Sequence, residues 1–402
     1  MVSFVSYQEF IAEIIKKNKL ENSITSIYAY GSMAQGNFEK NYSDPDLWFI
    51  INCNSVQERI ELIRQFTKIF NRELKKFFHK IQGVFCHNNL YFTEEEFKKY
   101  YQLYPTRIIY PIKMNIWKLV YGKDLFSDVE LPNRETCVQY LQYDFEMFCN
   151  EFHSLAFTVN TRDMIKYFLR ALKKSIWILK DEYLSCKDEV LKKAPTIFGE
   201  DKLLNDLILR IQKLKERNYF IIGKEYLDFY LDCSKVLEHY GREIKSYVTS
   251  NNYKLIEKDK LYATTIWGNL AWEFTVTISC WWNYDTDKKN KKKLLAALLY
   301  EDQTFMKYFN YIAIHGLKVE DIYFGKYNAP LKRSLILEPI EIDKGVYQDL
   351  LKLDGYKFLI GEHRENIVEN TFTNMGLEQL ISYIENKYLP AIYEVYRYFL
   401  LR

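Results

Sequence analysis

The chain contains 402 residues, of which 48% are hydrophobic and 27% are charged, and its formal net charge is only +3. This composition is typical of a folded globular protein and excludes a disordered chain, while the length predicts two or three domains. The small net charge disfavours a nucleic-acid polymer as the main partner but leaves that partner open.

Membrane-targeting features are not found in the sequence. Tyr7, Glu9 and Glu13 interrupt any apolar run near the N-terminus, and no stretch approaches the roughly 20 apolar residues of a membrane span. The seven cysteines form no C-x-x-C pair and are widely spaced, which is typical of buried thiols in a reducing compartment. We therefore expect a soluble, cytoplasmic protein without a membrane partner.

The first 131 residues alternate between helical and strand patterns. In chain order, we expect a helix over 7–20, strands over 23–30 and 46–51, a long helix over 55–78, and strands over 83–92 and 116–122. Three glutamates at 94–96 predict the start of a further helix. This order predicts a compact α/β domain over residues 1–131.

The pattern changes past Pro132, where glycine becomes rare and helical periodicity dominates. Segments 136–157, 161–184, 200–217 and 224–248 each suit a helix of a bundle, and further helical patterns cover 261–281, 292–312 and 375–400. We therefore predict an α+β protein. Its parts are the α/β domain over 1–131, a helical bundle domain over 132–250 and a mostly helical C-terminal extension of unknown role over 251–402.

The segment with the clearest chemistry covers residues 28–51 (YAYGSMAQGNFEKNYSDPDLWFII). Gly31 ends a strand and, lacking a Cβ atom, allows a ligand to approach the backbone closely. Ser32 opens a turn or helix whose N-terminus favours negative charge, and its hydroxyl suits a terminal phosphate oxygen. Asp44 and Asp46 are separated by one residue at the start of the next strand, so both can project to one side and share Mg²⁺.

Each part of this pattern is ordinary alone, because Gly-Ser and Asp-Pro-Asp both commonly form turns. Transfer of a phosphoryl group to a hydroxyl needs backbone donors for the phosphates and converging carboxylates for the metal. A strand that ends in Gly-Ser, followed by Asp-x-Asp before a second apolar strand, supplies both. The combination therefore predicts a nucleotide-binding site with Mg²⁺ as its cofactor.

The pattern resembles the polymerase-β-like nucleotidyltransferase superfamily, especially the small-molecule branch that includes the aminoglycoside nucleotidyltransferases. The resemblance covers residues 8–130 by motif and order of elements, and residues 131–250 by helical character. It implies a minimal α/β nucleotidyltransferase domain and a following helical bundle that completes the acceptor pocket. It also implies that Gly31 and Ser32 hold the triphosphate, and that Asp44 and Asp46 are the catalytic, Mg²⁺-binding carboxylates.

The sequence departs from the family pattern at two places. Pro45 stands between the two aspartates, where the family usually has an aliphatic residue, and proline fits only at the start or edge of a strand. Residues 81–90, which overlap the strand expected over 83–92, also lack the family's third carboxylate. Gln82 lies near the position of that acid, and His87 is the titratable alternative as general base.

A helix like that expected over 162–184 lines the acceptor pocket in the antibiotic-modifying relatives. By that resemblance, Asp181 or Glu182 would supply the base or bind a cationic acceptor, and Arg170 or Lys174 would reach the triphosphate. The alternative, which we favour for each residue taken singly, is an apolar core stripe with charges that face solvent.

We therefore expect an enzyme that transfers a nucleoside monophosphate to a hydroxyl of a small molecule, such as an antibiotic, and releases pyrophosphate. ATP is the favoured donor. Two alternatives remain open. The same fold could modify a tRNA or a protein, as nucleotidyltransferase-type toxins do. The chain could instead be a catalytically inactive nucleotide-binding regulator or assembly protein, for which the missing third carboxylate is the main support.

Overall fold

The structure of the chain is a computed structural model. It describes residues 4–35, 46–77, 90–156, 160–216, 218–254, 348–360 and 374–401. The chain divides into two compact units. We call them the sheet unit (Met1–Leu103, Ile112–Val129 and Lys258–Arg402) and the helical unit (Tyr104–Pro111 and Glu130–Glu257). A small sheet together with a mostly helical remainder confirms the predicted α+β class. The domain boundaries expected at residues 131 and 250 stay a prediction. No helix within the described ranges is both long and apolar enough to cross a membrane.

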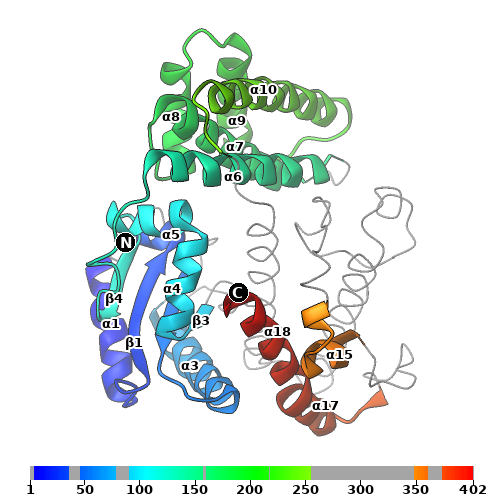
Figure 1. Cartoon of the computed structure of the whole chain (residues 1–402). Coiled ribbons are helices and arrows are strands. Elements are labelled where there is room, and N and C mark those ends of the chain that lie inside the picture. The colour runs from blue at the N-terminus through cyan, green and yellow to red at the C-terminus, as the bar shows by residue number, and fades with distance from the viewer. Residues whose placement is uncertain are drawn as a thin grey trace. The chain divides into compact units, whose positions relative to one another are not determined.

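A four-stranded sheet with the order β3-β2-β1-β4 organises the described part of the sheet unit (Figure 1). Its strands are β1 (Ile24–Tyr30), β2 (Asp46–Ile51), β3 (Leu90–Phe92) and β4 (Lys118–Gly122). Strand β1 pairs antiparallel with β2 and β4, and β2 pairs parallel with β3. The strands expected over 23–30, 46–51 and 116–122 are confirmed. Of the strand expected over 83–92, residues 83–89 lie outside the described residues.

The other described elements of the sheet unit are helices that extend to the C-terminal end of the chain. Their bounds are α1 (Phe4–Lys17), α2 (Gly31–Ala34), α3 (Val56–Phe77), α4 (Glu94–Leu103), α15 (Asp354–Ile360), α17 (Leu377–Tyr383), the π-helix η2 (Ile384–Tyr388) and α18 (Leu389–Leu401). Helix α5 (Pro105–Lys113) belongs for the most part to the helical unit. The predicted long helix begins where Ser55 accepts a hydrogen bond from the Glu58 backbone N–H at 3.1 Å, which is the capping pattern expected of Ser before a helix.

The two faces of the sheet carry different aromatic clusters. Phe49 packs against Phe66 and Phe70 of α3, with ring centroids 6.0 and 5.1 Å apart. The neighbouring Trp48 packs against Phe97 of α4, at 5.5 Å. Because adjacent strand residues point to opposite faces, α3 covers one side of the sheet and α4 the other. Asp46, two residues before Trp48, belongs to the α4 side.

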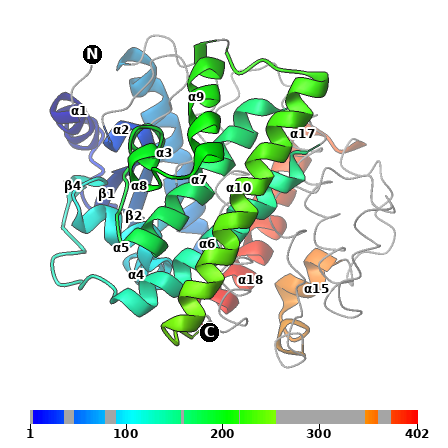
Figure 2. The same ribbon diagram turned by 90° about the horizontal axis from the view of Figure 1, so that it is seen from above.

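The helical unit is a bundle built around one central helix. Its helices are α6 (Arg134–Ser154), α7 (Thr161–Lys180), α8 (Lys187–Ile197), α9 (Lys202–Glu216) and α10 (Gly223–Ser250). Helix α7 packs against α6, α8 and α10, and Figure 2 shows α10 running alongside it. Phe168, Leu172 and Ile176 are fully buried, so the apolar stripe predicted for this helix is confirmed.

Several helix boundaries differ from the prediction, each for a local backbone reason. Helix α1 ends at Lys17 instead of residue 20, because Lys19 has a left-handed backbone (φ 55°) and the Leu20 N–H bonds back to the Ile15 carbonyl at 3.1 Å. Helix α7 ends at Lys180 instead of residue 184, since Asp181 is also left-handed, with φ 53°. A glycine would normally mark such positions, so the sequence carried little signal for either end.

Two helices were missed in the sequence because each contains a proline. Helix α5 includes Pro111 and α8 includes Pro195, and an internal proline ordinarily argues against a helix. The helix predicted to open at Glu94 is confirmed as α4. The helices expected over 261–281 and 292–312 lie outside the described residues.

A buried ion pair joins the C-terminal helix to the sheet. The Arg59 Nη1 and Glu96 Oε2 atoms are 2.5 Å apart, with side chains only 3% and 5% exposed. Arg59 also donates to the Tyr91 carbonyl on β3. From α18, the Tyr393 hydroxyl donates to Glu96 Oε1 at 3.1 Å, and its ring lies 5.2 Å from the Arg59 guanidinium. One carboxylate therefore connects α3, α4 and α18.

Replacing this carboxylate should destabilise the sheet unit far more than replacing an exposed neighbour. Glu96→Gln keeps the side-chain size but leaves the Arg59 charge buried without its partner, so we expect the free energy of unfolding to fall by about 3 kcal/mol. Glu94→Gln on the same helix is the control, because its pair with Lys123 is exposed and should contribute less than about 0.5 kcal/mol. Urea denaturation measures both, and equal losses would refute the structural role of Glu96.

Candidate functional site

The end of β1 and the start of β2 meet at Gly31 and Asp46. Tyr30, the last residue of β1, pairs with Asp46, the first residue of β2. Gly31 follows with φ +68°, a backbone conformation that side chains disfavour, and begins the short helix α2. A Cβ atom at Gly31 would overlap Asp46 Oδ2 and lie 3.1 Å from its Cγ. Position 31 therefore requires glycine both for its backbone angle and for space.

An aromatic cluster lies beside this junction. Tyr30 stacks on Trp48 at 4.6 Å, and Trp117 lies 5.5 Å from Tyr30 and 5.0 Å from Trp48. Trp48 is 2% exposed, whereas Tyr30, Trp117 and Asp46 are partly exposed. Because Asp46 and Trp48 are two residues apart on β2, the half-buried carboxylate and the cluster share one face of the sheet.

The other predicted site residues of the sheet unit are only partly covered by the structure. The backbone of Ser32 belongs to α2, directly after Gly31. Asp44, Gln82 and His87 lie outside the described residues, so the carboxylate pair and the third position stay predictions. In the parts of the chain that are described, no three His, Cys, Asp or Glu side chains are grouped to hold a metal ion.

Asp181 and Glu182, the predicted acceptor-side residues, directly follow α7 in the helical unit. Asp181 Oδ1 lies 2.7 Å from Arg134 Nη1, and the Asp181 side chain is 71% exposed. Glu182 Oε1 accepts from Lys193 Nζ at 2.9 Å. Each acid already has a basic partner within its own unit. Their roles as base or as ligand for a cationic acceptor stay predictions.

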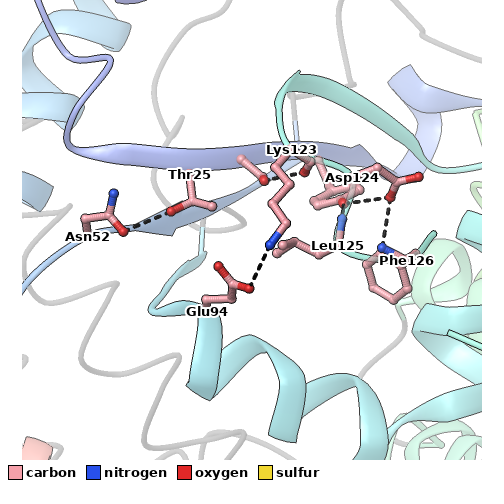
Figure 3. A network of polar contacts seen from close by, with 9 residues as sticks. Thr25, Asn52, Glu94, Lys123, Asp124, Leu125 and Phe126 are labelled. Carbon is pink, nitrogen blue, oxygen red and sulfur yellow. Dashed lines mark hydrogen bonds and ion pairs between the residues drawn. The ribbon is translucent and has the colours of Figure 1, made fainter. Parts of the chain in front are cut away.

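The opposite end of β1 is fixed by polar contacts that sequence reasoning missed (Figure 3). Thr25 Oγ1 donates to Asn52 Oδ1 at 3.0 Å, and Ser26 Oγ donates to the Lys123 carbonyl at 2.5 Å. The side chain of Lys123 lies 3.4 Å from Glu94 Oε1. Since a strand rises about 3.3 Å per residue, these contacts lie roughly 20 Å from Gly31 and hold the strand in register.

The same network buries a tyrosine hydroxyl. The Leu125 N–H donates to the Tyr28 hydroxyl at 2.7 Å, and that hydroxyl donates to Asp124 Oδ1 at 3.2 Å. Burial is the main reason that the pKa of Tyr28 rises well above its usual value. Tyr28 is therefore a neutral structural residue of the sheet and is not a candidate acid or base.

A cluster of buried charges in the helical unit was also missed. Asp144 on α6 is 2% exposed and forms ion pairs with both Arg107 of α5 and Lys174 of α7. The Lys174 Nζ atom lies 2.6 Å from Asp144 Oδ2. Burial alone would raise the pKa of Asp144, but the two cations outweigh burial and lower it. Lys174 is 9% exposed, so the expectation that the charges of this helix face solvent is wrong for Lys174. The feature of the sequence that could have indicated this cluster is Asp144 itself, which lies between the apolar core positions Leu141 and Phe145.

A shallow hollow between α9 and α10 carries mixed charges. Its lining residues are Arg210, Lys224, Glu225, Asp228, Leu231, Asp232 and Lys235. Asp232 lies 3.1 Å from Lys235 and 3.8 Å from Arg210, so the charges largely compensate one another. None of the predicted site residues lines it, and the stronger candidate remains the junction of Gly31 and Asp46.

Compared with protein-family models, with curated proteins and with solved structures, the chain shows no significant match. Function must therefore be inferred from the residues themselves.

The close contact between Gly31 and Asp46 predicts a specific energetic coupling. Gly31→Ala should lower the free energy of unfolding by about 2 kcal/mol, because alanine combines an unfavourable positive φ with an overlap against the carboxylate. In an Asp46→Ala background the overlap disappears, so Gly31→Ala should cost at least about 0.5 kcal/mol less. Urea denaturation of the four proteins in this double-mutant cycle measures the coupling, and strictly additive losses would contradict the contact.

Proposed function

We propose that this chain is a Mg²⁺-dependent nucleotidyltransferase that moves a nucleoside monophosphate, with ATP as the favoured donor, to a hydroxyl of a small acceptor. The observation that carries the proposal is the contact between Gly31 and Asp46. A backbone without a side chain lies directly against a carboxylate at the end of one strand and the start of the next. The carboxylate that we assign to Mg²⁺ therefore lies directly against the glycine that we assign to the phosphates.

The donor set fits a hard divalent cation. Asp46 presents carboxylate oxygens on a strand, and Asp44 precedes it by two residues in the sequence, which is the spacing for two ligands on one side. When bound, Mg²⁺ would neutralise part of the negative charge of the phosphates. The chain's own contribution is to hold the Asp46 carboxylate against Gly31 and to position the nucleotide, which is the larger part of catalysis in phosphoryl transfer.

The aromatic residues beside Asp46 support a nucleoside as the ligand. Tyr30 and Trp117 are partly exposed, and each packs against the other and against the buried Trp48 ring system. Flat aromatic surfaces next to a charged group favour a molecule with a planar base and attached phosphates. Nothing in this arrangement selects one base, so the preference for ATP rests on the family resemblance alone.

The acceptor hydroxyl must lose a proton as it attacks the α-phosphorus, and pyrophosphate leaves with the electron pair of the broken P–O bond. Gln82 or His87 is the position that we assign to this proton transfer. A general base raises the rate of such a reaction by about 10²–10⁴-fold, so an enzyme without the third carboxylate would be slow but active.

Loss of either aspartate should abolish turnover without unfolding the protein. We expect Asp46→Asn and Asp44→Asn each to lower Mg²⁺-dependent pyrophosphate release by about 10²-fold or more, because the charge that holds the metal is halved. Asp128→Asn, an exposed aspartate of the same unit, is the control and should retain full activity. The assay uses the four ribonucleoside triphosphates with a panel of small hydroxyl acceptors.

Two results of this assay would contradict the proposal. Full activity in both aspartate variants would show that the metal is bound elsewhere. If the wild-type protein releases no pyrophosphate with any nucleotide and acceptor but binds Mg²⁺-ATP, the catalytically inactive nucleotide-binding alternative is favoured instead.

A further inference from the structure

Exposed apolar side chains gather on one pair of helices, α9 and α10. Of the large apolar side chains that are exposed within the described ranges, only Met114 and Leu131 lie elsewhere. The other five belong to one short segment: Leu209, Phe220, Ile222, Leu227 and Leu231. The two helices contact each other and are joined by a short loop (Figure 2). Single exposed leucines are ordinary, whereas a concentration of them marks an interaction surface. We call these five residues the hairpin patch.

The loop between the two helices holds Phe220 and Ile222 outside the bundle. Asn218 and Tyr219 both have a left-handed backbone, with φ 52° and 60°, and the Tyr219 N–H bonds back into the last turn of α9 at 2.8 Å. Ile221 is 3% exposed, whereas Phe220 and Ile222 on either side of it are 71% and 58% exposed. A positive φ is uncommon for a bulky residue such as tyrosine. The loop is therefore anchored in one conformation, which presents two large apolar side chains to solvent.

Helix α10 continues the patch along its outer side. Leu227 and Leu231 are four residues apart and are therefore neighbours on the helix surface. The residues that α10 buries in the bundle, such as Tyr226, Phe229 and Cys233, lie on the opposite side of the helix. Helix α10 thus has two apolar sides, and the bundle covers only one of them.

The charged side chains beside Leu231 are balanced in sign. Three are basic and three are acidic: Arg210, Lys224, Lys235, Glu225, Asp228 and Asp232. A nucleic acid or an anionic membrane surface would need an excess of basic residues, which this face does not have. A balanced face can instead be complementary to itself, because a two-fold axis brings the cations of one copy to the anions of the other. The net charge of only +3 adds little repulsion between copies.

Part of this charge is available for contacts with a second molecule. Asp232 already pairs with Lys235 and Arg210. Among the residues that the structure describes, no ion pair is found for Lys224, Glu225 or Asp228, and all three are exposed. Charges of both signs therefore lie beside the apolar residues, as at the polar rim of a protein interface.

We propose that the hairpin patch is the interface of a homodimer, in which α9 and α10 of one copy pack against the same two helices of a second copy. A two-fold axis that passes between Leu227 and Leu231 places Leu227 of each copy opposite Leu231 of the other, with the two α10 helices antiparallel. The same arrangement places the loop of each copy, with Phe220 and Ile222, over later turns of the α10 helix of the other. Every exposed apolar side chain on α10 is then covered.

This interface goes beyond the proposed nucleotide transfer and does not depend on it. All residues of the hairpin patch belong to the helical unit, and none of them is among the residues that we assign to nucleotide, metal or acceptor. Failure of the transferase assay would therefore leave the dimer untouched, and a monomeric protein would leave the proposed transfer untouched.

The first test is analytical ultracentrifugation of the full chain over a wide range of concentrations. We expect a monomer–dimer equilibrium. Leu231→Ser should raise the dimer Kd by about tenfold or more, because one substitution removes an apolar contact from both copies at once. Leu131→Ser is the matched control, since Leu131 of the same unit is 46% exposed against 44% for Leu231 but lies outside the hairpin patch.

The second test reverses the charges of the face at low salt, where screening is weak. Lys224→Glu with Lys235→Glu leaves one cation among the six charges, and Glu225→Lys with Asp228→Lys leaves one acid among them. Each double variant alone should be monomeric, because like charges then meet across the two-fold axis. An equimolar mixture of the two should form a dimer again. Circular dichroism should show that every variant is folded.

Three results would overturn the proposal. The first is a wild-type protein that stays monomeric at every concentration, including one that binds anionic vesicles or another protein through this face. The second is a Leu231→Ser variant that dimerises as tightly as Leu131→Ser. The third is a mixture of the two charge variants that associates no better than either variant alone.

Discussion

The contact between Gly31 and the carboxylate of Asp46 constrains much of the sheet unit, because no side chain fits between them. It requires that β1 end and β2 begin at the same edge of the sheet, with Tyr30 directly opposite Asp46. It also requires a positive φ at Gly31, which turns the chain away from β1 into α2. A one-residue slip of β2 would turn Asp46 to the α3 side and separate it from the glycine.

The rest of the sheet unit keeps this register. Phe49 and Trp48 anchor β2 to α3 and α4 on opposite faces, and the contacts of Ser26 and Thr25 fix the far end of β1. Glu96 ties both helices to the C-terminal α18. Burial of an ion pair is costly unless its remaining hydrogen bonds are satisfied, and here the Tyr393 hydroxyl supplies one of them. The position of Asp46 therefore depends on packing contributed by residues more than 300 positions later in the chain.

The sequence was sufficient to predict the features that depend on local pattern. Strands β1 and β2 were predicted because apolar and β-branched residues fill them. The use of Gly31 and Asp46 in phosphate and metal binding, for which their spacing is suited, stays a prediction. The contact of Tyr393 with Glu96 was not predictable, since no local pattern records a partner so distant in the chain. The ion pairs of Asp144 were missed for a similar reason: Arg107 belongs to α5, a helix whose internal proline argued against it. Lys19 and Asp181 adopt the left-handed backbone that usually marks a helix end with glycine. Because neither residue is a glycine, the sequence did not indicate where these two helices end.

Binding of Mn²⁺, which replaces Mg²⁺ at carboxylate sites and is visible by electron paramagnetic resonance, tests whether the Gly31 and Asp46 junction is a metal–nucleotide site. The wild-type protein should bind Mn²⁺ in the presence of a non-hydrolysable ATP analogue, and much less without it. Asp46→Asn should weaken this nucleotide-dependent binding by at least about tenfold, whereas Asp128→Asn should leave it unchanged. Mn²⁺ binding that is the same in Asp46→Asn and in the wild type would contradict the assignment of this junction as the site.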